Sequence, residues 1–350
     1  LSGKLTAFFM KAFRHGGTAL PGLVAETIDK NVLKKISPHF KRGIILITGT
    51  NGKTTTANIL ANILRQKDWS LLRNSAGSNL KRGIISTILK NINLKGEFKN
   101  KIDFGIFECD EAALIEIALS LNPQIILFNN LFRDQLDRYG EVETVRKKWI
   151  NLIQNLKTDT KIILNADDPG VKSLGDYVQD KKNAFYFGLC NSINQEHLKD
   201  NTTYCITDFE RCPICGKELV YDERYFSHLG NYFCKNCSFK KPSLDVCVKN
   251  IYKSEFEIFY NNKKEQVKIS LLGLFNVYNF LAALAVSLNL NIDFSTIKKG
   301  IQSFNPIFGR QEEINFQDKK LVVSLVKNPV GFTEVLKTFF QEDGKKNIVI

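Results

Sequence analysis

The segment that most constrains the fold is residues 43–65, where a short apolar run leads into a glycine-bearing loop and then a helical pattern. Gly43–Thr48 reads Gly-Ile-Ile-Leu-Ile-Thr, a continuous apolar run typical of a strand buried on both faces of a parallel sheet. The loop Gly-Thr-Asn-Gly-Lys-Thr-Thr-Thr follows directly, and Ala57–Arg65 has a helical pattern. The sequence therefore predicts a strand, loop and helix unit, in which backbone amides at a helix N-terminus can bind phosphate.

The residues of this loop predict phosphoryl-transfer chemistry. Lys53 would reach the β and γ phosphates of ATP, and the Thr54 hydroxyl has the position that binds Mg²⁺. Gly49 lies nearer to Gly52 than the equivalent glycine does in the common phosphate loop, so this is a shortened variant. An ordinary glycine turn is the alternative, but strand, loop and helix all agree against it. The expected ATP-binding residues here are Gly49, Thr50, Asn51, Gly52, Lys53, Thr54 and Thr55.

Strand and helix patterns alternate after the loop. Strand-like runs at Asp103–Glu108, Gln124–Asn129 and Lys161–Asn165 are separated by helix-length segments at Ala112–Leu121 and Val142–Leu156. Such alternation predicts an α/β fold with a doubly wound, mostly parallel sheet. We expect an N-terminal segment (1–41), an ATPase domain (42–304) with an inserted module (205–242), and the start of a smaller α/β domain (305–350). Further strands are expected at Leu244–Val248, Phe256–Phe259 and Leu321–Val326, and an apolar strand-like run reaches Ile350.

The inserted module carries two Cys-x-x-Cys pairs. Cys212 and Cys215 are separated from Cys234 and Cys237 by a spacing typical of two zinc knuckles. Four thiolates saturate a tetrahedral Zn²⁺ and leave no position for water, which predicts a structural zinc ribbon with no catalytic role. The other four cysteines, Cys109, Cys190, Cys205 and Cys247, are expected to stay reduced as buried small residues.

Composition narrows the setting of the chain. Its 350 residues carry a formal net charge of +13, which favours phosphates, anionic lipid or nucleic acid without naming one of them. The longest apolar stretch, Leu271–Leu290, is interrupted by asparagines and a serine, so we expect no transmembrane segment. No signal peptide pattern is visible, and a reducing, cytoplasmic setting fits best. A zinc-ribbon ATPase acting on nucleic acid stays open at this point, because basic residues flank the cysteines.

The motifs, taken in order, resemble those of the Mur ligase family. Gly-Thr-Asn-Gly-Lys-Thr-Thr is the usual phosphate loop of that family, and further segments match its motifs in the family's order. These are Glu108 with Asp110–Ala112, Asn130–Gly140, Asn165–Pro169, Gly273–Asn279 and Phe308–Glu312. The resemblance implies a Mur-ligase-type ATPase domain in which Glu108 holds Mg²⁺. It also implies that Asn276 contacts adenine and that Arg310 reaches the nucleotide.

Each of these residues also has an ordinary structural interpretation. Glu108 could be an acid at a strand end, Asp167 and Asp168 a helix-capping turn, and Asn276 a helix cap. Many family members use a carbamylated lysine to hold a second Mg²⁺. Lys148 is near the position of that lysine, although matching the family motif from Asp134 onward puts Trp149 there. The roles of Lys148, Asp167 and Asp168 are left open.

Three further segments resemble one branch of the family, in which a synthase subunit amidates lipid II. The segments are Arg14–Val24, Phe132–Gln135 and Lys327–Phe332, and the branch also has the four-cysteine insertion. The resemblance implies that ATP activates the α-carboxylate of D-glutamate in the lipid II stem peptide as an acyl phosphate, and that ammonia converts it to D-isoglutamine. It implies a GatD-like glutaminase as heterodimer partner, lipid II at the inner membrane face, and no nucleic acid. A folylpolyglutamate-synthetase-like ligase and a binding subunit without catalysis are the remaining alternatives.

Overall fold

The computed structural model describes residues 19–74, 77–93, 96–133, 141–194, 208–252, 255–269, 273–304, 310–317, 319–326, 328–340 and 347–348. Several predictions fall outside these residues. They include the Asp134–Gly140 part of the third family motif, Cys205, Gly309 and the apolar run at Ile350.

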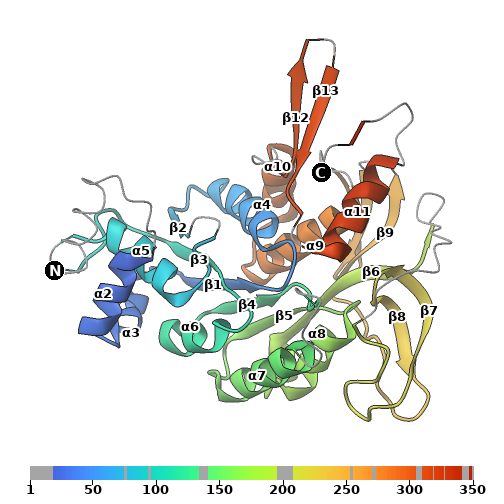
Figure 1. Cartoon of the computed structure of the whole chain (residues 1–350), viewed down its shortest axis with the longest axis horizontal. Coiled ribbons are helices and arrows are strands. Elements are labelled where there is room, and N and C mark those ends of the chain that lie inside the picture. Colours follow the sequence, from blue (N-terminus) through green and yellow to red (C-terminus); the bar gives the residue numbers. More distant parts are fainter. Residues whose placement is uncertain are drawn as a thin grey trace.

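A nine-stranded sheet runs through the centre of the molecule (Figure 1). Seven neighbouring strands, β9, β6, β5, β4, β1, β3 and β2, pair in parallel, and β10 and β11 extend the sheet beyond β9 as antiparallel strands. In spatial order the strands are β11 (Lys263–Lys268), β10 (Glu255–Tyr260), β9 (Val246–Tyr252), β6 (Ala184–Asn194), β5 (Lys161–Asn165), β4 (Ile125–Phe128), β1 (Gly43–Thr48), β3 (Phe104–Glu108) and β2 (Leu71–Arg73). The predicted α/β fold with a mostly parallel sheet is therefore confirmed.

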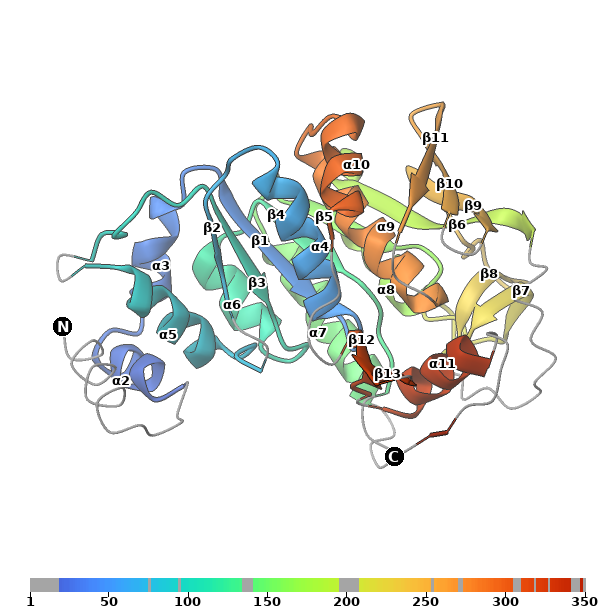
Figure 2. The same ribbon diagram turned by 90° about the horizontal axis from the view of Figure 1, so that it is seen from above.

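Helices cover both faces of the sheet (Figure 2). One core lies under α4 (Lys53–Arg65), α9 (Leu274–Asn289) and α10 (Phe294–Gln302). The opposite core lies under α2 (Leu20–Ile28), α3 (Val32–Ile36), α5 (Lys81–Asn91), α6 (Leu114–Leu121), α7 (Glu141–Asn155) and α8 (Pro169–Leu174). Within the described ranges, no helix combines the length and apolar character needed to cross a bilayer.

The central strands end at one edge of the sheet, and this places the phosphate loop. β1 lies between β3 and β4, with Ile47 beside Glu108 and Thr48 beside Phe128. All three strands are parallel, so the chain leaves each of them at the same edge, where ligands bind in open α/β sheets. The loop 49–52, Glu108 and the residues after β4 therefore meet there.

The inserted module contains a hairpin with a small core of its own. Strands β7 (Leu219–Phe226) and β8 (Leu229–Cys234) pair antiparallel, and Tyr232 and Phe239 pack with the cysteines. A second hairpin, β12 (Arg310–Phe316) with β13 (Lys319–Ser324), precedes α11 (Pro329–Phe340) and projects from the body in Figure 1. The expected strand at Leu321–Val326 thus begins and ends earlier than predicted. The domain boundaries themselves stay predictions.

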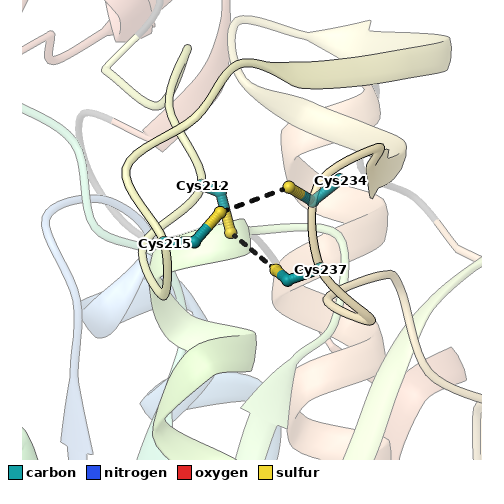
Figure 3. Close-up of side chains that lie close together, drawn as sticks. All are labelled: Cys212, Cys215, Cys234 and Cys237. Atoms are coloured by element: carbon teal, nitrogen blue, oxygen red, sulfur yellow. Dashed lines mark hydrogen bonds between the residues drawn. The ribbon is translucent and has the colours of Figure 1, made fainter.

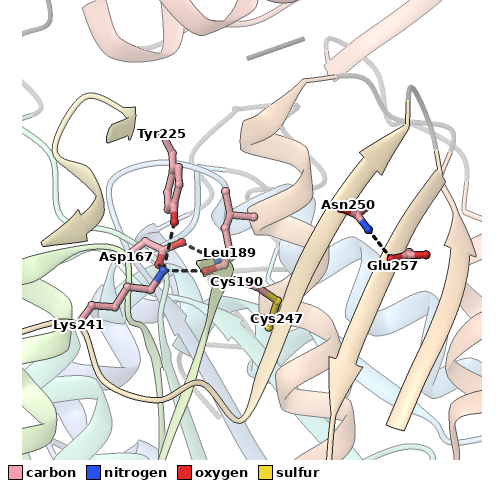
Figure 4. The surroundings of a disulfide bond; sticks show 8 residues. All are labelled: Asp167, Leu189, Cys190, Tyr225, Lys241, Cys247, Asn250 and Glu257. Atoms are coloured by element: carbon pink, nitrogen blue, oxygen red, sulfur yellow. Dashed lines mark hydrogen bonds and ion pairs between the residues drawn. A yellow bond between two sulfur atoms is a disulfide. The ribbon is translucent and has the colours of Figure 1, made fainter. Parts of the chain in front are cut away.

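The expectation that Cys190 and Cys247 are reduced was wrong, because the two form a disulfide (Figure 4). Sequence spacing gave no hint of the pairing, since 57 residues separate them. β6 and β9 are parallel neighbours, however, with Cys247 beside Gly188 and an irregular register after Leu189. The Cα atoms of Cys190 and Cys247 lie 5.3 Å apart, which is within bonding range. Cys109 is free and buried, as expected.

The contact of α10 with α4 gives a test of this packing. A Cβ added at Gly300 would lie 2.5 Å from the Cα of Ile63, so Gly300→Val should push the helices apart. We expect the free energy of unfolding to fall by about 2 kcal/mol, measured by urea denaturation. Lys299→Val, on the exposed side of the same helix, is the matched control and should change it by about 0.5 kcal/mol or less. Equal effects of the two substitutions would contradict the close packing.

Candidate phosphate-binding site and zinc centre

The phosphate loop needs glycine at its two ends. Gly49 has φ 136° and Gly52 has φ 84°, values that side-chain-bearing residues rarely adopt. A Cβ on Gly52 would also lie 2.0 Å from Oδ1 of Asn279, on α9. The loop therefore passes against α9 with no room for a side chain, and α4 begins immediately after it at Lys53.

Asparagine side chains hold the loop from behind. The backbone amide of Asn51 donates to Oδ1 of Asn130 at 2.8 Å, and its carbonyl accepts from Nδ2 of Asn129 at 3.0 Å. Nδ2 of Asn328, just before α11, donates to Oδ1 of Asn51 at 3.0 Å. The Thr50 hydroxyl exchanges two hydrogen bonds with the backbone of Phe132, both 2.9 Å. These bonds fix the loop conformation from segments far apart in sequence.

Lys53 contacts a carboxylate and two carbonyls of its own loop. Its Nζ donates to the carbonyls of Gly49 and Thr50 and forms an ion pair with Oε1 of Glu111 at 2.6 Å. The two side chains are only 10% and 15% exposed, so the pair is partly shielded from water. Glu111 is thus a site residue to which the sequence analysis gave no role, although it lies in the motif segment after Glu108.

Thr54 and Glu108, the predicted Mg²⁺ ligands, are in direct contact. The Thr54 hydroxyl donates to Oε2 of Glu108 at 2.6 Å. The backbone amide of Glu108 donates to Oδ1 of Asn74 at 2.9 Å, and Arg73 Nη2 lies 3.9 Å from its carboxylate. Hydroxyl and carboxylate oxygens are the ligand types that Mg²⁺ prefers, so the residues present fit this ion.

The structure gives fewer contacts at the loop for the other residues predicted to bind the nucleotide. Thr55 is buried in the first turn of α4. Asn276 is buried on α9, where its Oδ1 accepts from Nδ2 of Asn279 at 3.2 Å. Asn279 in turn contacts Asn129 and Thr56 at the loop. Arg310 begins β12, and its side chain lies outside the described part of the structure. The adenine and nucleotide contacts of Asn276 and Arg310 stay predictions.

Trp149 faces the site, whereas Lys148 does not. Trp149 is fully buried, and its indole Nε1 donates to the carbonyl of Glu111 at 2.9 Å. Lys148 is exposed on α7, which favours the interpretation of a solvated helix charge. The tryptophan thus supports the segment that carries Glu111.

Asp167 and Asp168 are both completely buried. Asp168 caps α8 by accepting from the amides of Gly170 and Val171, in agreement with the structural interpretation. Asp167 forms an ion pair with Nζ of Lys241 at 2.7 Å and accepts from the Tyr278 hydroxyl at 2.7 Å. Burial raises the pKa of the Asp167 carboxyl, while Lys241 and these hydrogen bonds oppose that change. Figure 4 shows the Lys241 side chain pointing toward Asp167.

The four cysteines of the inserted module converge (Figure 3). Their Sγ atoms all lie within 4.8 Å of one another, with Cys212 3.6 Å from Cys237 and Cys215 3.5 Å from Cys234. Four sulfurs around a zinc at the usual bond length would be about 3.8 Å apart. The cluster fits a zinc ion.

Sequence reasoning missed three side chains around the site, which have no motif signal of their own. Asn129 bonds the loop, Asn74 bonds the backbone of Glu108, and His228 contacts Asp168. The first two follow the ends of β4 and β2, and polar residues just beyond the carboxyl ends of parallel strands are candidates on topology alone. His228 lies at the tip of the β7–β8 hairpin and could not have been assigned without the fold.

Comparison with known proteins agrees with this architecture. A profile described as the Mur ligase middle domain matches residues 47–215. The chain is 31% identical, over 99% of its length and 75% of the relative's, to the Staphylococcus aureus lipid II isoglutaminyl synthase (glutamine-hydrolyzing) subunit MurT. It is 32% identical to the Streptococcus pneumoniae subunit of the same name, over 96% of this chain and 72% of the relative.

Solved structures show the same fold. A pseudomurein peptide ligase type C from Methanothermus fervidus superposes with a TM-score of 0.67 at 29% identity, over 85% of this chain and 56% of that one. MurF ligase from Thermotoga maritima, solved in complex with ADP, superposes with a TM-score of 0.60 at 16% identity, over 91% and 62%. The present chain thus spans little more than half of these solved structures. On the motifs, the fold and the identity to its relatives, the chain belongs to the MurT branch of the Mur ligase family.

Proposed function

We propose that this chain is the synthase subunit of a lipid II isoglutaminyl synthase, an ATP-dependent carbon–nitrogen ligase of peptidoglycan biosynthesis. It would amidate the α-carboxylate of D-glutamate in the lipid II stem peptide to D-isoglutamine. The observation that carries the proposal is the cluster of Lys53, Thr54 and Glu108 at the carboxyl edge of the sheet, in a chain similar to MurT subunits along almost its whole length.

The chemistry assigned to these residues is electrostatic. Lys53 and the loop amides would bind the phosphates of ATP, with Thr54 and Glu108 holding Mg²⁺. Bound Mg²⁺ neutralises charge on the transferred phosphoryl group. A carboxylate oxygen of the substrate attacks the γ-phosphorus and ADP leaves, which gives an acyl phosphate. Ammonia then attacks the acyl carbon, phosphate leaves with its bridging oxygen, and loss of a proton gives the amide.

Ammonia would come from a separate glutaminase of the GatD type. The similar MurT subunits are named as parts of a glutamine-hydrolyzing enzyme, and we assign no glutaminase residue to this chain. We infer a heterodimer working in the cytoplasm at the inner face of the cell membrane, where lipid II is presented. The net charge of +13 would favour an anionic leaflet.

The first test is mass spectrometry of lipid II incubated with the full-length protein, its glutaminase partner, ATP, Mg²⁺ and glutamine. We expect the mass change from carboxylate to amide at D-glutamate. Lys53→Ala should slow it about 100-fold or more, because the phosphoryl charge loses its cation. Lys147→Ala, an exposed lysine on α7, is the control and should retain activity. Unchanged lipid II, with ATP hydrolysis stimulated by nucleic acid instead, would favour the zinc-ribbon ATPase alternative.

A second prediction concerns the Lys53–Glu111 ion pair. Phosphate must compete with Glu111 for Lys53, and the carboxylate also repels the triphosphate. Glu111→Gln should therefore tighten binding of a non-hydrolysable ATP analogue by about fivefold, equivalent to roughly 1 kcal/mol. Isothermal titration calorimetry measures this, with Asp110→Asn as the neighbouring control that should leave affinity unchanged. Weaker binding by Glu111→Gln would instead mean that the carboxylate helps to hold the nucleotide and its metal.

A third prediction concerns the zinc centre. We expect the purified protein to contain one zinc ion per chain, measured by inductively coupled plasma mass spectrometry, because four thiolates close the coordination shell. Cys237→Ser should lower the zinc content and the melting temperature, since metal binding contributes to folding. Cys109→Ser, in the core away from the cluster, should retain the metal. Full zinc retention in Cys237→Ser would contradict the four-cysteine site.

A further inference from the structure

We propose that His228, at the tip of the zinc-ribbon hairpin, is a positioning residue for the phosphate loop, so that zinc binding and nucleotide binding reinforce each other. The proposal rests on the proposed function in so far as the loop is taken to bind ATP. It assigns the ribbon a role in organising the nucleotide site beyond its own stability.

The hairpin tip is buried, which is unusual for a turn. Hairpin tips normally lie at the surface, yet Ser227 is 2% exposed and His228 is 0% exposed. The His228 ring packs between Phe132 and Phe209, with centroid separations of 4.6 Å and 5.2 Å. The tip therefore lies between the ATPase body and the segment around Phe209 that leads into the ribbon.

A short chain of contacts connects His228 to the phosphate loop. Its Nε2 lies 3.2 Å from Oδ2 of Asp168, and the same oxygen accepts from the amide of Leu131 at 2.8 Å. The next residue, Phe132, exchanges two hydrogen bonds with Thr50 in the loop. His228 thus touches the loop's anchor twice, through the Asp168 carboxylate and through the Phe132 ring.

The rest of the ribbon contacts the turn 165–169, which also carries Asp168. The Tyr232 hydroxyl donates to the carbonyl of Ala166 at 2.9 Å, and the amide of Gly230 donates to the carbonyl of Asp167 at 3.0 Å. Tyr232 belongs to the small core around the zinc cysteines. Loss of the metal would loosen that core, and the disturbance would pass along β8 to the tip.

His228 makes its polar contact through Nε2, so its role can be tested by conservative replacement. Nδ1 has no hydrogen-bond partner within the described residues, so the ring acts through Nε2 and its faces. Gln places a side-chain nitrogen near the Nε2 position and can restore the bond. Phe keeps an aromatic ring between Phe132 and Phe209 but removes the nitrogen that contacts Asp168.

The experiment measures two affinities on the full-length protein. Isothermal titration calorimetry gives the affinity for a non-hydrolysable ATP analogue with Mg²⁺, and competition with a chromogenic chelator gives the affinity for zinc. We expect His228→Phe to weaken nucleotide binding about tenfold, within the usual range of coupling between sites. His228→Gln should recover most of the loss, and Lys240→Ala, exposed on the ribbon, should behave as wild type.

Reciprocal coupling between the two affinities can be measured, and a purely structural role of His228 would not change it. If zinc strengthens nucleotide binding, saturating nucleotide must strengthen zinc binding by the same factor. Wild-type protein should show this effect, and His228→Phe should lose it while still binding both ligands. The wild-type measurement stands even if the variant fails to fold.

The outcomes separate this proposal from the proposed function. Nucleotide binding with zinc affinity that does not change when nucleotide is added would overturn the coupling and leave the ligase proposal intact. A wild-type protein that binds no ATP analogue would overturn both. Coupling without amidation of lipid II would support the role of His228 and count against the assigned substrate.

Discussion

A phosphate-binding loop has to be held in its conformation by groups other than the anion that it binds. Here the holding groups are asparagine side chains brought together by the register of β1 with β4 and by α9. Each amide is buried and would destabilise the fold if left unpaired. Asn129 and Asn130 both donate to the carbonyl of Asn51 in the loop, and Asn129 also donates to Asn279, so these bonds form only while the loop has its present conformation. The conformation of the loop is thus a consequence of the whole sheet.

The ribbon is attached to this sheet by buried polar contacts. Lys241 forms an ion pair with Asp167, and His228 contacts Asp168, with all four side chains no more than 3% exposed. A buried ion pair seldom adds net stability, yet loss of one partner is strongly destabilising because the other charge is left buried and unpaired. The aspartates therefore specify where the ribbon docks more than how firmly the protein folds. The turn 165–169, to which the sequence analysis assigned no role, thus holds the ribbon against the sheet.

Much of this could be predicted from the sequence because it depends on local patterns. The apolar run at Gly43–Thr48, the loop and the cysteine spacing each specify a structure over a few residues, and the observed β1, α4 and cysteine cluster agree. The rest depends on contacts between distant segments. Neither the Cys190–Cys247 disulfide nor the Lys53–Glu111 ion pair could be predicted from the spacing of its residues in the sequence. His228 gains its position only when β7–β8 folds against β4 and β5, and no periodicity encodes that.

The place of the ribbon follows from a rule of parallel sheets. β6 and β9 are parallel neighbours, so the chain between them must cross back over the sheet, usually through a helix. The described part of this connection, 208–245, contains the hairpin β7–β8 and no helix. In this described part the zinc ribbon lies in the connection that a helix usually forms, and the disulfide between β6 and β9 joins the two strands that flank it. A crossover begins at the carboxyl end of its strand, the edge where the phosphate loop lies. A ribbon in this position is well placed to contact the loops after β4 and β5, whereas an insertion at the opposite edge would have no route to them.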